Sequence, residues 1–234
     1  MDKTLSSVQR RGFLRRAGAG LAGIGAVAGG AVLAAQAPAG GGAAWHPARH
    51  DADSWLDAIP GSHRFVLDTI SLDGFGTALF YVNNFYNANQ TGYGLGNADL
   101  AVVIIARHES TPFAYNEAMW AKYGEALGRS YGFTDPKTKA APTVNLFQAS
   151  GYGADLTNNG VTIGSLVERG THFGVCQLAT RRAASIIGRA TGQEVNAVVA
   201  ELTSNLVPNA HMVPAGIVAI ARAQEHGYAF SYVG

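Results

Sequence analysis

Seven apolar residues follow one another without interruption from Leu100 to Ala106, reading LAVVIIA. A strand with one solvated face alternates apolar and polar residues, and this run does not. A continuous apolar run of this length is typical of a strand that is buried on both faces, in the middle of a parallel sheet. The segment therefore predicts a central parallel strand.

The residues on either side of this run alternate between strand and helix patterns. The segment His63–Leu72, HRFVLDTISL, is rich in β-forming residues and predicts a first strand. We expect Asp73 to cap a following helix, whose apolar residues keep helical spacing at Leu79, Val82 and Tyr86. Thr111 and Pro112 are expected to begin the next helix, with a buried stripe at Trp120, Tyr123 and Leu127.

The last third of the chain continues the alternation. Thr171–Val175 predicts a short strand that leads to Cys176. A helix follows it, in which Ala179, Ala183, Ile186 and Ile187 keep helical spacing. His211–Val213 and Tyr228–Val233 predict two further strands. Between them we expect a helix from Pro214 that carries Ile217, Ile220 and Ala221 and stops at Gly227. Strands and helices at this spacing indicate an α/β sandwich with a largely parallel sheet.

The beginning of the chain has the pattern of an export signal. Arg10-Arg11-Gly12-Phe13-Leu14 resembles a twin-arginine motif, and a run without charge extends from Ala17 to Ala37. Small residues at Ala35-Gln36-Ala37 fit a cleavage site, although an uncleaved anchor is the alternative. We therefore predict a signal peptide at residues 1–39, a linker at 40–62, an α/β domain at 63–234 and a periplasmic or extracytoplasmic location.

Removing that segment changes the charge of the chain. Residues 1–39 hold five of the 17 Lys and Arg and one of the 16 Asp and Glu, so the remainder has a net charge of −3. This balance provides no basic surface for nucleic acid. After Gly40 no run without charge is long enough for a membrane span, so no stable span is expected once the signal is removed.

Cys176 is the one cysteine in the sequence, so it has no partner for a disulfide within the chain. It lies where a predicted strand ends and a helix begins, at the edge of a parallel sheet where ligands usually bind. The first N–H groups of that helix would stabilise a thiolate, and Arg181 and Arg182 would add positive potential. His172 is four residues away, about 13 Å along an extended strand, which is too far for contact. The alternative is that Cys176 is a small buried apolar residue.

Other chemical motifs are incomplete. The glycines at 74–76 and 92–96 do not form a dinucleotide-binding pattern, and no nucleophile elbow or phosphate loop occurs. His46 and His50 have the spacing of helical metal ligands, but Pro47 lies between them. His108-Glu109 would lie at the carboxyl edge of the central strand, where it could line a site, but a solvated polar turn is the interpretation we favour. We therefore predict neither a bound cofactor nor a metal.

The segment Thr134–Asn159 is rich in turn-forming residues and long for a connection inside a domain. A lid and an oligomer contact are alternatives, but an elaborated loop is the interpretation we favour.

Two motifs carry a family resemblance. The strand Thr171-His-Phe-Gly-Val-Cys176 with its helix, and Met212-Val-Pro-Ala-Gly with its helix and Gly227-Tyr-Ala-Phe230, resemble the DsrE/DsrF-like family, in particular its exported branch. The likeness is strongest over 160–233 and weaker over 63–127. It implies a three-layer α/β/α sandwich with a mainly parallel five-stranded sheet, assembled as a trimer or hexamer. It also implies that Cys176 is the catalytic residue and carries sulfur as a persulfide.

Three functions follow as hypotheses. In the first, Cys176 accepts sulfane sulfur from a small sulfur compound or a protein thiol and passes it on. In the second, the chain is a non-enzymatic oligomeric module whose cysteine packs in the core. In the third, Cys176 is a thiol redox sensor.

Overall fold

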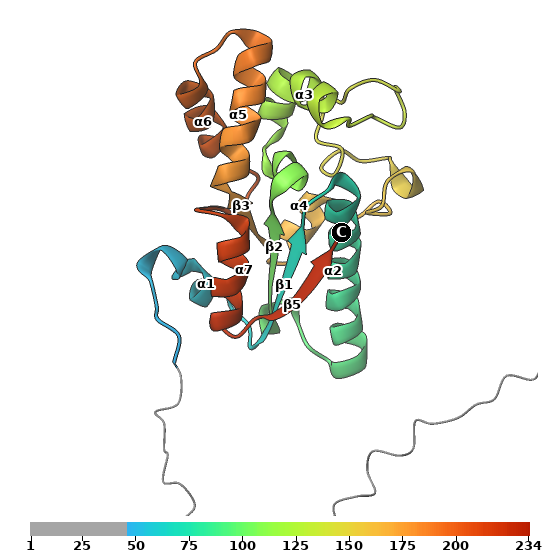
Figure 1. Cartoon of the computed structure of the whole chain (residues 1–234). Helices are drawn as coiled ribbons and strands as arrows, with labels where there is room; N and C mark the ends of the chain where they lie inside the picture. Colours follow the sequence, from blue (N-terminus) through green and yellow to red (C-terminus); the bar gives the residue numbers. More distant parts are fainter. Residues whose placement is uncertain (1–45) are drawn as a thin grey trace, which may run out of the picture. The chain divides into compact units, whose positions relative to one another are not determined.

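The computed structural model describes residues 46–234, which form one unit (Figure 1). The predicted signal peptide at residues 1–39 lies outside the described residues, as does the beginning of the predicted linker. A five-stranded sheet has the order β4-β3-β2-β1-β5, and every neighbouring pair is parallel. The strands are β1 (His63–Thr69), β2 (Leu100–Ala106), β3 (His172–Cys176), β4 (Ala210–Val213) and β5 (Ala229–Val233). The predicted α/β class with a parallel five-stranded sheet is thus confirmed.

Strand β2 is the centre of the sheet, and all of its residues are buried. Its side chains alternate between two apolar clusters, one on each face, as the uninterrupted run LAVVIIA predicted. Leu100, Val102 and Ile104 face one cluster, whereas Ala101 and Val103 face the other. The absence of polar residues in this strand is therefore explained by helices on both sides.

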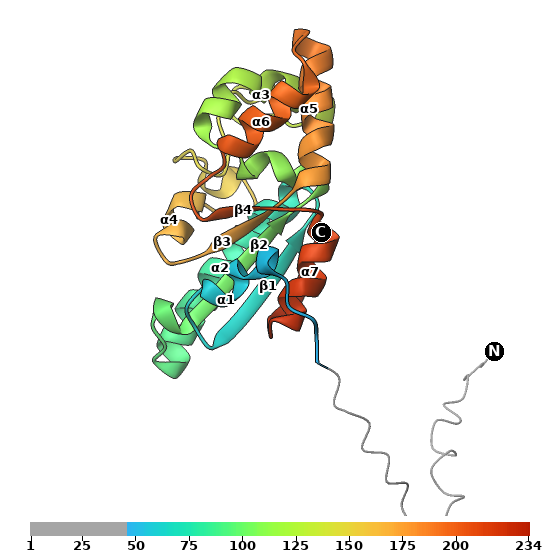
Figure 2. The ribbon, with the colours of Figure 1, turned by 90° about the vertical axis from the view of Figure 1, so that its left-hand side faces the viewer.

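The two faces of the sheet carry different helices (Figures 1 and 2). On one face lie α1 (Trp55–Ala58) and α7 (Gly216–Glu225), and the opposite face is covered by α2 (Leu72–Tyr93) and α4 (Ile163–Val167). The remaining helices gather beyond the carboxyl ends of the strands and extend the cluster on the α2 face: α3 (Glu117–Tyr131), α5 (Gln177–Thr191) and α6 (Val195–Ser204). Short 3-10 turns complete the description: η1 (Asp51–Asp53), η2 (Asn97–Asp99), η3 (His108–Ala114) and η4 (Gly153–Asp155).

Two helices begin at residues other than those expected. Ser71, not Asp73, caps α2, because its hydroxyl accepts a hydrogen bond from the N–H of Gly74 at 2.9 Å. Thr111 and Pro112 lie inside the turn η3, and α3 begins three residues after that turn, with Asn116 as its cap. Both differences arise because several residues with capping side chains occur close together, and only the backbone path selects among them.

The buried face of α7 also differs from the expectation. Of the apolar residues that this helix was expected to carry, Ile220 is buried, but Ile217 and Ala221 are exposed. The buried positions are Gly216, Ala219, Ile220 and Ala223. A helix of small residues can approach the sheet closely, so its largest apolar side chains need not be those that face it. The exposed Ile217 becomes important for the site described below.

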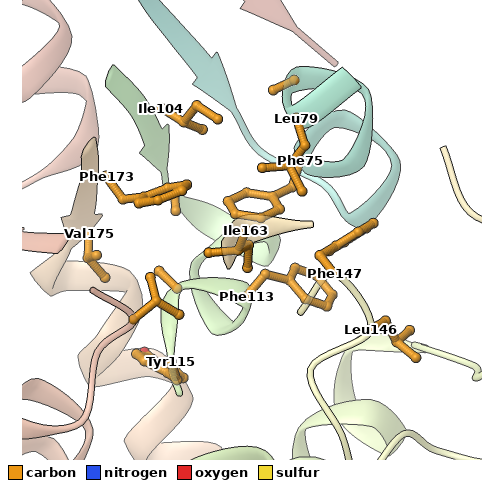
Figure 3. Close-up of a cluster of buried hydrophobic side chains, with 14 of the residues drawn as sticks. Phe75, Leu79, Ile104, Phe113, Tyr115, Leu146, Phe147, Ile163, Phe173 and Val175 are labelled. Carbon is orange, nitrogen blue, oxygen red and sulfur yellow. The ribbon is translucent and has the colours of Figure 1, made fainter. Parts of the chain in front are cut away.

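Segment 134–159 belongs to the core. Leu146 and Phe147 are fully buried, and Phe147 contacts Phe75 of α2 and Phe113 of η3 (Figure 3). The fully buried amide of Asn145 donates to the backbone oxygens of Phe113 and Tyr115 at 2.9 and 3.0 Å. The segment is therefore an elaborated loop that the fold has incorporated, as favoured from the sequence.

The described part of the predicted linker docks on the α7 face. Leu56 and Ile59 are buried in the same cluster as Val66, Ala101 and Val103. Within residues 46–234, no helix has both the length and the apolar character that a membrane crossing requires.

Candidate functional site

Cys176 is the last residue of β3 and the N-cap of α5, as the sequence predicted. Its side chain is 7% exposed, and its Sγ accepts a hydrogen bond from the N–H of Ala179 at 3.5 Å. The sulfur therefore occupies the place where helices most often carry an oxygen acceptor. A thiolate at this position receives the partial positive charge of the helix N-terminus.

A pocket of about 280 Å³ opens at Cys176. Three segments that leave the carboxyl edge of the sheet form its walls: the end of β2, the β3–α5 turn and the start of α7. The lining residues are Arg107, His108, Cys176, Leu178, Ala179, Arg182, Ala215, Gly216 and Ile217. The pocket thus combines one thiol with two guanidinium groups and one imidazole.

The strand register explains why these segments meet. Ala106 of β2 lies opposite Val175 of β3, so the next residues, Arg107 and Cys176, leave the sheet side by side. Cys176 in turn lies opposite Val213 of β4, shortly before α7 begins. Three crossover connections therefore bring residues from distant parts of the chain to one edge.

Arg107 is held in place by Asp68 of β1. Its Nε and Nη2 donate to the two carboxylate oxygens at 2.7 and 2.8 Å, and Asp68 is only 2% exposed. This hydrogen bond is the main reason why the pKa of Arg107 rises above its usual value, while partial burial opposes the rise. The neighbouring Tyr232 and Cys176 contribute further attraction.

The stem of Arg107 lies against Gly216 at the start of α7. A Cβ atom on Gly216 would approach the Cβ of Arg107 to 2.6 Å and its Cδ to 2.9 Å. Such distances are too short for real side chains, so glycine at this position allows the arginine to pass. The salt bridge and the glycine together fix the guanidinium at the pocket.

His108 follows Arg107 and has a left-handed backbone, with φ of +58°. Its side chain is 51% exposed, and its Nδ1 lies 4.0 Å from a carboxylate oxygen of Glu109. The pair is a polar turn, as the sequence indicated, but His108 also lines the Cys176 pocket. Beneath the turn, the Ser110 hydroxyl donates to the Thr69 backbone oxygen at 2.9 Å.

The two arginines expected to add positive potential differ in position. Arg182 lines the pocket, and its guanidinium lies 5.8 Å from the centre of the Tyr131 ring. Arg181 does not line the pocket, although both arginines are exposed. Only one of the two predicted cations therefore belongs to the site.

His172 is separate from Cys176, as its spacing predicted. Its Nδ1 lies 3.0 Å from Nε2 of His211, and the His211 ring stacks on Trp55 of α1 at 4.2 Å. Burial, assisted by the neighbouring His211, lowers the pKa of His172 to about 4. The pair therefore binds α1 to the sheet at neutral pH in its uncharged form.

The weak metal pattern at His46 and His50 gathers no further ligands. His50 lines a different pocket, together with Asp53 and Arg222. Within residues 46–234, no three His, Cys, Asp or Glu side chains lie close enough together to hold a metal ion.

Asp68, Arg107 and Gly216 belong to the site but were not predicted from the sequence. One signal was present: Asp68 is the one acidic residue of its strand and follows the apolar residues Phe65–Leu67, and Arg107 directly follows the apolar run Leu100–Ala106. Charges at the ends of two buried parallel strands meet at the same edge of the sheet, so they are candidates for a pair.

No family model and no curated protein matches this chain. Among solved structures, the chain is similar to a protein of unknown function, MTH1491 from Methanobacterium thermoautotrophicum, with 15% identity and a TM-score of 0.37. That similarity covers 73% of this chain and 99% of the other. At this level the likeness decides neither family nor function.

Proposed function

We propose that this protein is a sulfur carrier or sulfurtransferase that acts through a persulfide on Cys176. The observation that carries the proposal is the pocket in which a thiol at a helix N-terminus is surrounded by Arg107, His108 and Arg182. A thiolate is the nucleophile in sulfur exchange, and cations and helix N–H groups favour it over the thiol. The resemblance of the β3–α5 segment to DsrE/DsrF-like proteins agrees with this role.

The reaction is a displacement on sulfur. With thiosulfate, the Cys176 thiolate attacks the sulfane sulfur, a new S–S bond forms, the S–S bond of thiosulfate breaks, and sulfite leaves with the bonding electrons. The product is a Cys176 persulfide anion. An acceptor thiolate then attacks the outer sulfur of the persulfide and releases the Cys176 thiolate, so no external oxidant or reductant is required.

The cations also indicate the charge of the donor. Asp68 already balances the charge of Arg107. Arg182 lies over the Tyr131 ring, and within residues 46–234 it forms no salt bridge. The pocket therefore has a positive excess and suits an anionic donor such as thiosulfate or polysulfide. We further propose that residues 1–39 direct the protein through the twin-arginine pathway to an extracytoplasmic compartment.

The second candidate function is an oligomeric module without catalysis. Leu178 and Ile217 line the pocket and are 63% and 62% exposed, so apolar surface lies at the mouth of the site. A homo-oligomer, a trimer or hexamer as the resemblance implies, would cover them. In this case Cys176 serves as a packed apolar residue or, as the third hypothesis has it, as a redox sensor.

Mass spectrometry of the intact protein separates these functions. After incubation with thiosulfate or polysulfide, we expect a mass increase of one sulfur atom that dithiothreitol reverses and that the Cys176→Ser variant lacks. The absence of an adduct with either donor, or an equal adduct on the serine variant, would overturn the sulfur-carrier proposal. A peroxide-induced dimer on non-reducing gels, without persulfide formation, would favour the redox sensor.

A further inference from the structure

Strand β5 is an open edge of the sheet (Figure 1). Within residues 46–234 it pairs with β1 alone, so no strand pairs with the backbone N–H and C=O groups on its outer side. An edge of this kind accepts another strand, and natural proteins usually guard it with charged residues, prolines or a covering element. The sequence of β5, AFSYV, contains neither a charged residue nor a proline.

The opposite edge of the sheet, β4, is guarded. Pro208 and Pro214 stand on either side of this four-residue strand. The Trp55 ring of α1 stacks on the ring of His211 at 4.2 Å and covers it. Of the two edge strands that the structure describes, β5 is therefore the one without protection.

Two exposed aromatic side chains lie on β5. Phe230 and Tyr232 are 44% and 52% exposed. Both point to the α7 face, because they lie in register with Val66 and Asp68 of β1, and Val66 belongs to the cluster on that face. Ser231 lies between the two aromatic residues and points to the other face.

We infer that β5 is the surface through which two copies of this chain associate, as antiparallel neighbours about a two-fold axis at Ser231. The strand fits its own copy, because with Ser231 opposite itself the Phe230 side chain of each copy faces Tyr232 of the other. Cross-strand aromatic pairs of this kind attract each other. Residues 227–234 carry no charged side chain, so the two-fold axis brings no like charges of the strand together.

The contact is small, and its size sets the conditions of the test. An aromatic side chain buries about 150 to 250 Å², and these two are already half covered, so the copy adds about 200 Å² of burial per protomer. A standard stable interface buries about 800 Å² per partner. Backbone hydrogen bonds along the strands supply further affinity. We therefore expect a reversible dimer whose population rises with protein concentration.

Cysteine crosslinking tests the position of the two-fold axis. The Cys176→Ser background removes the native thiol, and Ser231→Cys then places one cysteine opposite its own copy. Facing residues of antiparallel strands have Cα atoms about 4.5 to 5.5 Å apart, which a disulfide spans. Under mild oxidation with copper phenanthroline we expect a band of twice the mass on a non-reducing gel. Ser130→Cys in the same background is the control, because position 130 is exposed on α3 and should give no such band.

Sedimentation equilibrium under reducing conditions measures the association itself. We expect the weight-average mass of the wild type to rise with concentration toward twice that of one chain. Phe230→Lys places an ammonium group against the edge of the other copy, so its mass should stay at that of one chain. Tyr81→Lys is the matched control, because it changes an aromatic residue of α2 that is 51% exposed, and it should associate as the wild type does.

Thermal unfolding separates lost association from lost folding. Phe230→Lys replaces a partly exposed side chain, so its Tm at low concentration should remain near that of the wild type. A wild type that stays monomeric at high concentration, or a Phe230→Lys protein that associates as the wild type does, would overturn the inference. The same holds if Ser231→Cys crosslinks no faster than Ser130→Cys, since copies would then meet through another surface. None of these measurements involves a sulfur donor, so their outcome is independent of the proposed function.

Discussion

Arg107 and Asp68 form a two-point salt bridge at the carboxyl edge of the sheet, with N···O distances of 2.7 and 2.8 Å. The carboxylate is almost fully buried, whereas the arginine is half-buried and reaches the Cys176 pocket. A planar guanidinium held at two points cannot rotate away, so the pair gives the site a cation of fixed orientation. The net charge of the Arg107–Asp68 pair is zero, so its role is to hold the guanidinium in place beside Cys176.

The Asp68→Asn variant tests this role. Loss of the carboxylate leaves Arg107 without its partner, and we expect the free energy of unfolding in urea to fall by about 2 to 4 kcal/mol. The variant should also react more slowly with thiosulfate, because the guanidinium is no longer fixed beside Cys176. As a control, Glu225→Gln removes one partner of the Arg222 pair at the surface and should cost less than about 1 kcal/mol. A loss no larger than that of the control would contradict the positioning role.

Gly216→Ala tests the contact between α7 and Arg107. An added methyl group would lie 2.6 Å from the Cβ of Arg107, so either the helix or the arginine must move. We expect a loss of about 1 to 3 kcal/mol in urea unfolding together with slower persulfide formation. The matched control is Gly92→Ala in α2, where nothing lies within 4 Å and the helix should gain up to about 1 kcal/mol. If both variants gain the same free energy of unfolding, the contact with Arg107 does not require glycine at position 216.

Arg182→Gln tests the charge of the donor. A charge-assisted contact with an anion is worth about 1.5 to 3 kcal/mol, so we expect the variant to react about tenfold or more slowly with thiosulfate. Its rate with uncharged iodoacetamide should change much less. Arg181→Gln is the matched control, since it removes the same charge from the adjacent residue outside the pocket. If both electrophiles are slowed equally, Arg182 acts on the thiol and not on the donor.

The strands were predictable from the sequence because each is a short apolar or β-branched segment between turn residues. The uninterrupted apolar run Leu100–Ala106 predicted a strand in the middle of the sheet. The position of Cys176 was predictable because the spacing of apolar residues changes there from that of a strand to that of a helix. The register was not predictable, because helices and loops between the strands set it, and these connections are long. For this reason Cys176 was identified from local pattern, whereas Arg107, whose partner Asp68 is 39 residues away, was not. His108 could be placed at the carboxyl edge from the sequence, but its position beside Cys176 depends on the pairing of Ala106 with Val175.

The pair His172–His211 predicts a loss of stability in acid. The pKa of His172 is lowered to about 4 in the folded protein, below about 6.5 in an unfolded chain, so the unfolded state binds more protons between these values. The contribution of neutral His172 to the free energy of unfolding is therefore fully present above about pH 6.5, and it is lost as the pH decreases toward about 4. The loss, reduced by the partial exposure of the ring, should be on the order of 2 kcal/mol.

Urea unfolding at several pH values checks this prediction. The His172→Gln variant cannot take up the proton, so its stability should depend less steeply on pH than that of the wild type. His63→Gln changes an exposed histidine at the start of β1 and should retain the wild-type slope. A His172→Gln protein with an unchanged slope would show that acid acts elsewhere.

Asn145→Ala tests whether segment 134–159 is part of the core. The Asn145 side chain donates to the backbone oxygens of Phe113 and Tyr115 and accepts from the N–H of Phe147 at 3.1 Å. Its removal leaves three buried backbone groups without partners, each worth about 1 to 3 kcal/mol, so we expect a loss of at least about 3 kcal/mol in urea unfolding. Asn84→Ala on the exposed face of α2 should change stability by no more than about 0.5 kcal/mol. A lid would open without unfolding the domain, and the Asn145→Ala variant would then be as stable as the Asn84→Ala control. A large cooperative loss of stability means instead that the domain depends on this segment, which borders the cluster of Phe75, Phe113 and Phe147.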